Sequence, residues 1–344
     1  MTDRKLGIAI HGAGWVGHAH AASWLKNSQA QIVSVSDADR QRAACFAADF
    51  GLACAIRDDY QQVLDDPRVD VVDITSPSHF HARQGIAAAQ AGKHLLVEKP
   101  MALTMAENRA LRDAVAAAGV KSVAGFVLRW NPAAETIKSL VGSGALGQLV
   151  YAEVDYWHQM RTTHHAWQLH SRKQTGGSAM LLVGCHAVDT LRWLTGDEVI
   201  EVTAVANNPR GLFEYPANVV AVLRFRSGII GKTSVLLDAE VPYQFNMDLT
   251  GTAGTIRDNR LWSPRLLPGQ STWTTIPTIL PDSGDVTHHP FDGEINHFVD
   301  CILRDRQSHC SVADAFRSHE VCLAIDRSLE AGGRAVTLPS GDGA

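Results

Sequence analysis

The amino-acid sequence predicts an α/β protein with an amino-terminal, doubly wound parallel sheet and a carboxy-terminal α+β domain. Apolar strand patterns alternate with helical patterns through the first part of the chain, which is typical of parallel sheets. A glycine-rich turn, Gly12–Gly17, follows the first strand pattern and opens the first helical one. From about Tyr151 several strands follow one another with alternating apolar and polar residues. Because 344 residues exceed one ordinary core, we expect two domains, 1–125 and 126–344.

In the first domain, short apolar runs are separated by helical patterns and short connections. The expected strands are Leu6–His11, Gln31–Ser36, Val69–Thr75 and Leu95–Val97. The expected helices are His18–Lys26, Asp39–Phe50, Tyr60–Leu64, His81–Ala91 and Thr104–Ala118. Gly51, Gly92 and Gly119 stand where glycine commonly ends a helix.

In the second domain, the strand patterns predict a mainly antiparallel sheet. The expected strands are Tyr151–Trp157, Val199–Ala206, Val219–Phe225, Ile229–Leu237 and Gln244–Thr250. Ser227-Gly228 falls between two of them, where a tight hairpin turn is expected. The expected helices are Ala179–Leu194, Glu294–Leu303 and Val312–Leu329.

Composition argues against several classes of partner. The formal net charge of -5 gives no basic surface for nucleic acid or for acidic lipid. We find neither a secretory signal nor a run of roughly 20 apolar residues that could span a membrane. The 6 cysteines are scattered without a C-x-x-C pair, which favours reduced thiols in the cytoplasm. The 16 histidines lack a metal-binding spacing, so we expect no metal.

The glycine-rich turn has the spacing of a dinucleotide-binding Rossmann unit. Gly12 permits the tight turn, Gly14 lets the backbone approach a pyrophosphate, and Gly17 allows close packing of helix and strand. Asp37 ends the next strand, about 20 residues beyond the last glycine, where it can accept hydrogen bonds from ribose hydroxyls. Its charge favours NAD over NADP, although Arg40 nearby could soften the repulsion of a 2′-phosphate.

A second motif, Glu98-Lys99-Pro100, ends a strand of the same predicted sheet. Ligands bind at the carboxyl ends of parallel strands, so Lys99 would lie near the nicotinamide and could polarise a substrate hydroxyl. The alternative interpretation is an ordinary surface lysine at the end of a strand.

These motifs resemble, in their order, those of the Gfo/Idh/MocA family (glucose-fructose oxidoreductase, inositol dehydrogenase and rhizopine catabolism proteins). The resemblance spans roughly residues 5 to 338 and includes two late segments, Gly251–Ile256 and Phe291–Phe298. The segments that carry it are the glycine-rich turn, Thr75-Ser76-Pro77 with His81, Glu98-Lys99-Pro100, and Gly176-Gly177 followed by Gly184-Cys185-His186.

The resemblance implies a Rossmann domain, a second domain with an open-faced sheet, and a homodimer or homotetramer. It implies oxidation or reduction of sugars, sugar derivatives or inositols with NAD or NADP. Lys99 is then catalytic, His186 is the acid or base, and the Lys99–Pro100 peptide is cis. The residues expected to contact the cofactor are Gly12, Gly14, Trp15, Val16, Gly17, Asp37, Arg40, Thr75, Pro77, His81, Glu98, Lys99 and Pro100.

One departure from the family concerns Leu182, which stands four residues before His186 in place of a common aspartate. Ser178 likewise follows Gly176-Gly177 where the family has a third glycine. Three interpretations remain open: Lys99 and His186 suffice, another group replaces the carboxylate, or ordinary dehydrogenation has been lost or altered. The replacement candidates are Asp155, His158, His165 and Asp189.

Residues 157–173 combine aromatic and polar side chains, which suits the rim of a site for a polyhydroxylated ligand. The alternative is an exposed loop, and packing is the rival role for Arg129. The expected substrate-binding residues are Lys99, Arg129, Trp157, His158, His165, Trp167, Lys173 and His186.

The leading hypothesis is an NAD-dependent oxidoreductase in which His186 takes the proton of a secondary alcohol and Lys99 stabilises the charge on its oxygen. A rival hypothesis is an enzyme that oxidises a sugar transiently, eliminates a glycosidic group and recycles its NAD. The third is a non-catalytic sensor that binds the dinucleotide.

Overall fold

A computed structural model describes residues 4–278 and 289–339 and divides the chain into two compact units. Unit 1 comprises Met1–Val127 and Pro290–Phe316, and unit 2 comprises Leu128–His289 and Arg317–Ala344. The chain therefore returns to unit 1 after most of unit 2, a return that the sequence pattern did not indicate.

Sheet A of unit 1 is parallel throughout, with the strand order β3-β2-β1-β4-β5-β6. Its strands are β1 (Leu6–His11), β2 (Ala30–Ser36), β3 (Ala55–Arg57), β4 (Val71–Ile74), β5 (His94–Val97) and β6 (Ser122–Ala124). The predicted doubly wound parallel sheet is confirmed. The short strands β3 and β6 were not predicted, because three residues show no periodicity of their own.

The helices of unit 1 connect these strands, except for α10, which belongs to the segment that returns from unit 2. They are α1 (Trp15–Trp24), α2 (Arg40–Asp49), α3 (Tyr60–Leu64), the 3-10 turn η1 (Ser78–Phe80), α4 (His81–Gln90), α5 (Met105–Ala118) and α10 (Phe291–Leu303). Since the strand order reverses between β1 and β4, right-handed crossovers place α1 and α2 on one face of sheet A and α4 and α5 on the other. Thr104 caps α5 through a capping box with Glu107, and Gly119 ends it in the left-handed conformation.

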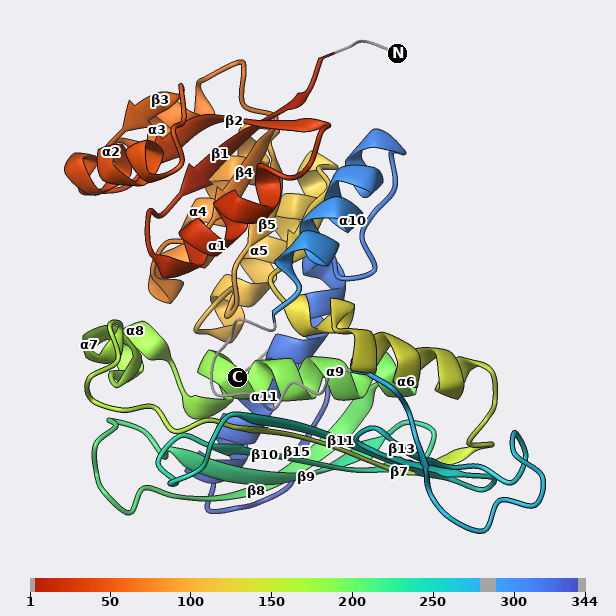
Figure 1. The fold of residues 1–344 in the computed structure, drawn as a ribbon. Helices are drawn as coiled ribbons and strands as arrows, with labels where there is room; N and C mark the ends of the chain where they lie inside the picture. Colours follow the sequence, from red (N-terminus) through yellow and green to blue (C-terminus); the bar gives the residue numbers. More distant parts are fainter. Residues whose placement is uncertain (1–3, 279–288, 340–344) are drawn as a thin grey trace. The chain divides into compact units, whose positions relative to one another are not determined.

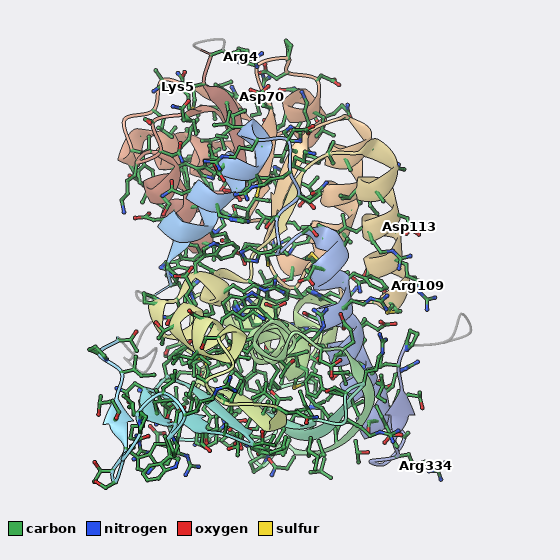
Figure 2. All side chains as sticks on the ribbon, turned by 90° about the vertical axis from the view of Figure 1, so that its right-hand side faces the viewer. Arg4, Lys5, Asp70, Arg109, Asp113 and Arg334 are labelled. Carbon is green, nitrogen blue, oxygen red and sulfur yellow. The ribbon has the colours of Figure 1, made fainter. Side chains whose placement is uncertain are left out.

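Polar contacts dock the returning helix α10 on α1. The hydroxyl of Ser23 donates to Oδ1 of Asp292 at 2.6 Å, and Nζ of Lys26 lies 2.8 Å from Oδ2. At the amino-terminal edge of sheet A, Arg4 pairs with Asp70 at 2.9 Å (Figure 2). These contacts hold α10 against α1 and the amino-terminal segment against sheet A.

Sheet B of unit 2 is mixed, with the strand order β14-β13-β12-β11-β7-β10-β9-β8-β15. Its strands are β7 (Leu149–Trp157), β8 (Val199–Asn207), β9 (Asn218–Phe225), β10 (Ile230–Leu236), β11 (Gln244–Gly251), β12 (Thr255–Arg257), β13 (Arg260–Trp262), β14 (Thr274–Thr275) and β15 (Val336–Thr337). Among the described strands of sheet B, only β7 and β10 pair in parallel. This confirms the predicted, mainly antiparallel second sheet. The predicted hairpin joins β9 to β10, and Gly228 has a φ of +95°.

The helices of unit 2 lie over one face of sheet B, as α6, α9 and α11 show in Figure 1. They are α6 (Pro132–Gly142), α7 (Trp167–His170), α8 (Lys173–Gly176), α9 (Cys185–Thr195) and α11 (Val312–Glu330), which begins in unit 1. A π-helical turn, η3 (Met180–Gly184), precedes α9, so the helix predicted over Ala179–Leu194 is not α-helical throughout. Among residues 4–278 and 289–339, no helix is both long and apolar enough to cross a membrane.

Candidate active site

The turn between β1 and α1 has the backbone geometry that its glycines predict. Gly12 has a φ of +115°, and a Cβ there would lie 2.5 Å from the backbone nitrogen of Ser76. A Cβ on Gly17 would lie 2.4 Å from the carbonyl oxygen of Gly12. No described atom lies within 4 Å of a Cβ added to Gly14. Close packing therefore requires the two outer glycines, and the middle one leaves room for a pyrophosphate.

Helix α1 begins at this turn and can bind an anion. Its first residues are Trp15 and Val16, and its cap, Gly14, has an extended backbone and no side chain. The amide groups of the first turn and the positive end of the helix dipole can therefore serve phosphate oxygens. Thr75, after β4, closes the turn from the other side, because its hydroxyl donates to the carbonyl of Gly12 at 2.8 Å.

Asp37 directly follows β2 and borders the same turn. Its Oδ2 accepts from the amide of Ala13 at 3.0 Å, and its Oδ1 accepts from the amide of Asp39 at 2.9 Å. The carboxylate is thereby fixed at the carboxyl end of β2, where the sequence placed a ribose acceptor.

The arginine near Asp37 is a different one from that expected. Nη1 of Arg40 lies 3.8 Å from Oδ1 of Asp58, whereas Nη1 of Arg42 lies 3.6 Å from Oδ1 of Asp37. Arg42 is therefore the cation that offsets the charge of Asp37 in this structure.

Lys99 follows β5, two strands from β1 in the order β1-β4-β5. The carboxyl ends of parallel strands share one edge, so Lys99 and the glycine-rich turn lie on the same edge of sheet A. The Lys99–Pro100 peptide is cis, as the family resemblance implied.

His81, at the start of α4, contacts the backbone on both sides of its ring. Nδ1 lies 2.8 Å from the carbonyl oxygen of Pro100, and Nε2 lies 2.6 Å from that of Ser76. Burial lowers the pKa of His81, although both carbonyl groups act in the opposite direction. His81 therefore ties the segment after β4, which includes Pro77, to the segment after β5.

Glu98 is buried, and its carboxylate holds the backbone of its neighbour. Oε2 accepts from the amide of Lys99 at 3.0 Å, and Oε1 lies 3.2 Å from Nε2 of His20. Burial alone would raise the pKa of Glu98, but the hydrogen bond and charge of His20 lower it below its usual value.

In unit 2, His186 is the second residue of α9 and is buried. The preceding π turn has five-residue hydrogen-bonded steps, so either Leu181 or Leu182 lies one turn before His186. Both leucines are buried and apolar. Neither register of the helix therefore provides the carboxylate that the family commonly has.

The surroundings of His186 are aromatic. The ring of Tyr156, on β7, stacks on it with centroids 5.9 Å apart and an interplanar angle of 10°. The ring of His289 lies at 5.9 Å, and Tyr243 packs edge-on against Tyr156 at 5.1 Å. Burial raises the pKa of Tyr156, so its hydroxyl stays protonated.

Asp155 points away from this cluster. Neighbouring residues of a strand face opposite sides, and Tyr156 faces α9. On the other face, Oδ1 of Asp155 accepts from Ser234 at 2.6 Å and Oδ2 from Lys232 at 2.7 Å. Trp157 lies on this same face, where its indole donates to Ser234 at 2.8 Å. Asp155 and Trp157 are therefore not brought to His186.

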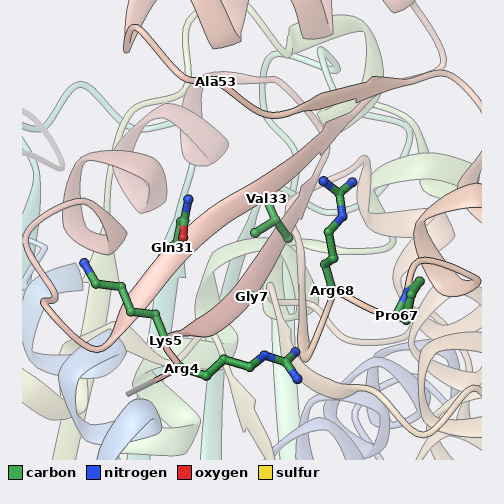
Figure 3. A pocket seen from close by; sticks show the side chains of 8 residues that line it. All are labelled: Arg4, Lys5, Gly7, Gln31, Val33, Ala53, Pro67 and Arg68. Carbon is green, nitrogen blue, oxygen red and sulfur yellow. The ribbon is translucent and has the colours of Figure 1, made fainter. Parts of the chain in front are cut away.

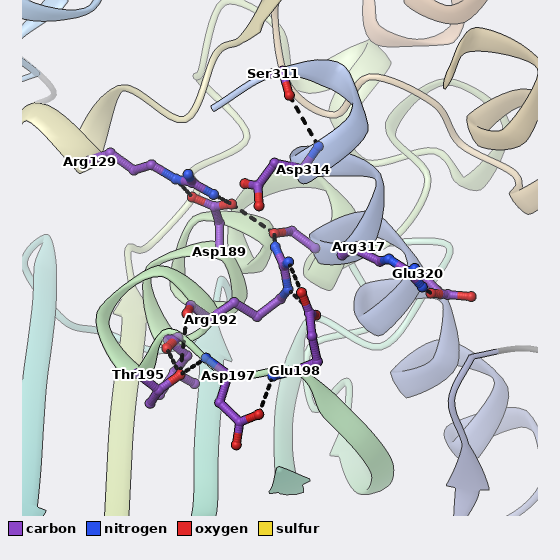
Figure 4. Close-up of polar contacts among 12 residues, drawn as sticks. Arg129, Asp189, Arg192, Thr195, Asp197, Glu198, Ser311, Asp314, Arg317 and Glu320 are labelled. Atoms are coloured by element: carbon purple, nitrogen blue, oxygen red, sulfur yellow. Dashed lines mark hydrogen bonds and ion pairs between the residues drawn. The ribbon is translucent and has the colours of Figure 1, made fainter. Parts of the chain in front are cut away.

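Asp189 is also engaged elsewhere. Its two oxygens accept from Nε and Nη2 of Arg129, both at 2.6 Å, and Oδ1 accepts from Ser318 (Figure 4). Arg129, expected near substrate, is buried in this pair.

The candidate rim residues of unit 2 lie in several places. The ring of His158 lies 5.4 Å from that of Tyr243, close to the aromatic cluster. Trp167 packs against Phe213 at 4.9 Å, and the Lys173 ammonium pairs with Glu330 at 3.1 Å. His165 is exposed, with its ring 4.2 Å from that of His164. The ring contact of His158 places it beside the cluster that holds His186.

A hollow in unit 1 lies at the wrong edge of sheet A for a cofactor. Gly7, Gln31 and Arg68 are among the residues that line it, and they stand near the amino ends of their strands (Figure 3). Dinucleotides bind outside the carboxyl ends.

Within residues 4–278 and 289–339, no group of His, Cys, Asp or Glu side chains could hold a metal ion.

Comparison with protein families agrees with this geometry. The oxidoreductase family with an NAD-binding Rossmann fold matches residues 6–126, and the GFO/IDH/MocA C-terminal domain matches residues 134–257. The chain belongs to the Gfo/Idh/MocA family. It is accordingly an oxidoreductase with an NAD-binding Rossmann unit, into which the glycine-rich turn and Asp37 fit.

Similar proteins of the Gfo/Idh/MocA family cover about three quarters of the chain or more. The NAD⁺-dependent scyllo-inositol 2-dehydrogenase of Bacillus subtilis (strain 168) is 26% identical over 96% of each chain. The levoglucosan dehydrogenase of Pseudarthrobacter phenanthrenivorans is 27% identical over 74% of this chain and 73% of its own. A solved levoglucosan dehydrogenase in complex with NADH and L-sorbose superposes with a TM-score of 0.87, at 25% identity over 97% of this chain and 99% of its own.

Sequence reasoning missed the buried polar residues behind the site of this Gfo/Idh/MocA protein. Asp73 interrupts the apolar strand Val71–Ile74, and His20 lies on the buried side of α1. A buried acid in such a run was the available signal, because buried charges are normally paired. Tyr156 gave no comparable signal, since tyrosine is common in strands.

Proposed function

We propose that this Gfo/Idh/MocA protein is an NAD-dependent dehydrogenase or reductase for a secondary alcohol of a cyclic sugar, sugar derivative or inositol. The observation that carries the proposal is the fixed position of Lys99, whose backbone is held by Glu98 on the sheet edge that bears the glycine-rich turn. The similar proteins named above, which carry inositol and levoglucosan in their names, support this class of substrate.

The chemistry divides between two residues. Oxidation of an alcohol removes the hydroxyl proton and a hydride from the same carbon, and bound NAD⁺ supplies the hydride acceptor. The imidazole of His186 takes the proton, and the ammonium group of Lys99 stabilises the negative charge that develops on oxygen. In the reverse direction His186 returns the proton to the carbonyl oxygen.

Of the interpretations of Leu182, we favour the one in which Lys99 and His186 suffice. Asp155 contributes to a network on the opposite face of sheet B, and both oxygens of Asp189 bind Arg129. His158 remains a candidate for contact with the substrate, because it borders the aromatic cluster of Tyr156 and Tyr243.

We also propose self-association through the face of sheet B that no described helix covers. Four exposed apolar side chains support this: Val205, Val220, Val222 and Ile230. A homodimer or homotetramer would bury them, and light scattering of the wild type and Val222→Arg tests this. A wild-type monomer at micromolar concentration would contradict it.

The six free thiols support a cytoplasmic location, which a fluorescent fusion would test.

The test of the reaction is a panel of inositols, aldoses and anhydrosugars, offered with NAD or NADP and followed by NADH absorbance. Lys99→Met and His186→Asn are each expected to lower turnover by about 10²–10⁴-fold. Lys121→Met is the matched control, because its ammonium pairs with the exposed Asp305 at 2.8 Å.

Two outcomes would overturn the proposal. Release of a glycosidic group without net NADH would indicate an enzyme that recycles its NAD during elimination. Tight binding of NAD with no turnover across the panel would indicate a sensor.

A further inference from the structure

A buried chain of charges lies directly behind Lys99 in unit 1. We call Asp73, His20 and Glu98 the charge chain. Nδ1 of His20, on α1, lies 3.0 Å from both oxygens of Asp73, in β4. Its Nε2 lies 3.2 Å from Oε1 of Glu98, whose other oxygen accepts the amide of Lys99. The indole of Trp24 donates to Asp73 at 2.7 Å.

Both ring nitrogens of His20 meet carboxylates, Nδ1 through hydrogen bonds to Asp73 and Nε2 at ion-pair distance from Glu98. A neutral imidazole has one N–H donor, yet both ring nitrogens face carboxylates that can only accept while ionised. Burial by itself lowers the pKa of His20, but the charges and hydrogen bonds of Asp73 and Glu98 outweigh it and raise the pKa well above its usual value. His20 is therefore an imidazolium with two carboxylates as partners.

The groups that face His20 from other elements agree with this charge. Asp73 lies in β4, Glu98 directly follows β5, and Glu294 lies in α10. The ring of Phe291 packs on His20 with centroids 4.9 Å apart. Burial raises the pKa of Glu294 well above its usual value. The charge of His20 acts in the opposite direction, and the charges of Glu98 and Asp73 raise the pKa further, so Glu294 is a neutral acid.

The carboxylate of Glu98 has little freedom to move. Gly125, after β6, lies so close that a Cβ there would be 2.6 Å from Oε1 and 2.8 Å from Cδ of Glu98. A side chain at position 125 would displace the carboxylate. The fold thus confines Glu98 between a bare glycine, the imidazolium and the amide of Lys99.

We propose that His20 is a positioning residue for Lys99, acting through the carboxylate of Glu98. The inference rests on the proposed function, in which Lys99 is catalytic. Without the imidazolium, Glu98 would be a buried, unpaired anion or would take up a proton. A protonated Glu98 would accept from the Lys99 amide without charge assistance, and an unpaired anion would no longer be held in place by the imidazolium. In both cases the lysine loses its fixed position beside the glycine-rich turn.

A merely structural role for the charge chain makes different predictions. Core residues lower stability when they are replaced but leave the turnover of the folded enzyme unchanged. A positioning residue lowers kcat while the glycine-rich turn, which it does not touch, still binds NAD. Because His20 and Glu98 act as one unit, their replacements should also be strongly non-additive.

The experiment compares His20→Gln, Glu98→Gln and the double variant in the full-length protein, with kcat measured on the best substrate of the panel. Each single variant is expected to lower kcat about 10- to 100-fold, because small displacements of a catalytic group have effects of that size. NAD affinity should stay within about threefold in His20→Gln, because His20 is not among the residues expected to contact the cofactor. The double variant should be no slower than the slower single one. His94→Gln, at the amino end of β5, is the matched control and should retain full turnover.

A measurement on the wild type does not depend on the folding of variants. Histidine ¹⁵N NMR, with His20→Gln for assignment, should show both ring nitrogens of His20 protonated from pH 6 to pH 8. A neutral tautomer at pH 7 would overturn the inference, and so would multiplicative losses in the double variant. Full turnover of His20→Gln beside an inactive Lys99→Met would overturn the inference alone. Full turnover of Lys99→Met would overturn the proposed catalytic role itself.

Discussion

Arg129 and Asp189 form a bidentate ion pair inside unit 2, with both nitrogen–oxygen distances at 2.6 Å. The side chains are 2% and 1% exposed, and Ser318 donates a further hydrogen bond to Asp189 at 2.7 Å. To act as a base near His186, Asp189 would have to leave a buried guanidinium without its counter-charge. The pair therefore stabilises α9 through Asp189. Because Asp189 is engaged in this way, His186 is the group on α9 that can accept the proton of the substrate.

Arg129→Met should lower the free energy of unfolding by about 3–5 kcal/mol, because it leaves Asp189 as a buried anion with only a hydroxyl partner. Arg129→Lys should recover part of this loss, since one ammonium cannot make two parallel hydrogen bonds. Urea unfolding followed by tryptophan fluorescence measures both. The control is Arg161→Met, which breaks an exposed pair with Glu240 and should change stability by less than about 0.5 kcal/mol. A loss below about 1 kcal/mol in Arg129→Met would contradict the structural role.

Leu182 should behave as a packing residue. It is 3% exposed, so Leu182→Met should change stability by less than about 1.5 kcal/mol and leave turnover within about threefold of wild type. Leu182→Asp restores the carboxylate of the family but should destabilise the protein by several kcal/mol, because it places a carboxylate at a position that is 3% exposed. Initial rates and urea unfolding of both variants test this. A stably folded Leu182→Asp variant with a higher turnover than the wild type would contradict this, because it would show that the reaction needs a carboxylate at this position.

Much of unit 1 could be predicted from the sequence because its determinants are local. The positive φ of Gly12 and the place of Asp37 directly after β2 follow from short motifs whose backbone requirements are well understood. The cis peptide before Pro100 followed from the family resemblance alone.

The charge chain could not be predicted in the same way. His20, Asp73 and Glu98 are distant in the sequence, and only the right-handed crossovers from β1 to β5 bring them together. The π turn before His186 likewise has no sequence signature, because Met180–Gly184 has the apolar composition of any buried helix. Docking of α10 on α1 depends on a hydrogen bond between Ser23 and Asp292. Nothing in their residue types or in their positions in the sequence indicates that they pair.

Asp37→Ala should shift the cofactor preference toward NADP. The change removes a carboxylate that can accept from ribose hydroxyls, and it leaves Arg42, 3.6 Å from that carboxylate, beside the vacated space. A charge-assisted hydrogen bond contributes about 1.5–3 kcal/mol, so kcat/KM for NAD should fall about 10- to 100-fold while that for NADP rises. Steady-state rates with each cofactor measure this, and Asp113→Ala, an exposed acid on α5, is the control. An unchanged ratio would remove Asp37 from the ribose site.

Glu294→Gln should make the protein relatively more stable as the pH rises. Glu294 is 0% exposed, and no described residue hydrogen-bonds to either of its oxygens. Its pKa is raised well above the usual value by burial and by the charges of Glu98 and Asp73, although the charge of His20 opposes the shift. The unfolded chain loses this proton above about pH 4.5 while the folded protein keeps it, so the wild type loses stability with rising pH. Relative to Glu294→Gln, that loss should be about 1.4 kcal/mol per pH unit at 25 °C, up to the folded pKa.

Urea unfolding of both proteins from pH 5 to pH 8 measures the slope, and Glu240→Gln, at an exposed site, should run parallel to the wild type. Parallel curves for Glu294→Gln and wild type would show that Glu294 ionises as an ordinary surface acid does.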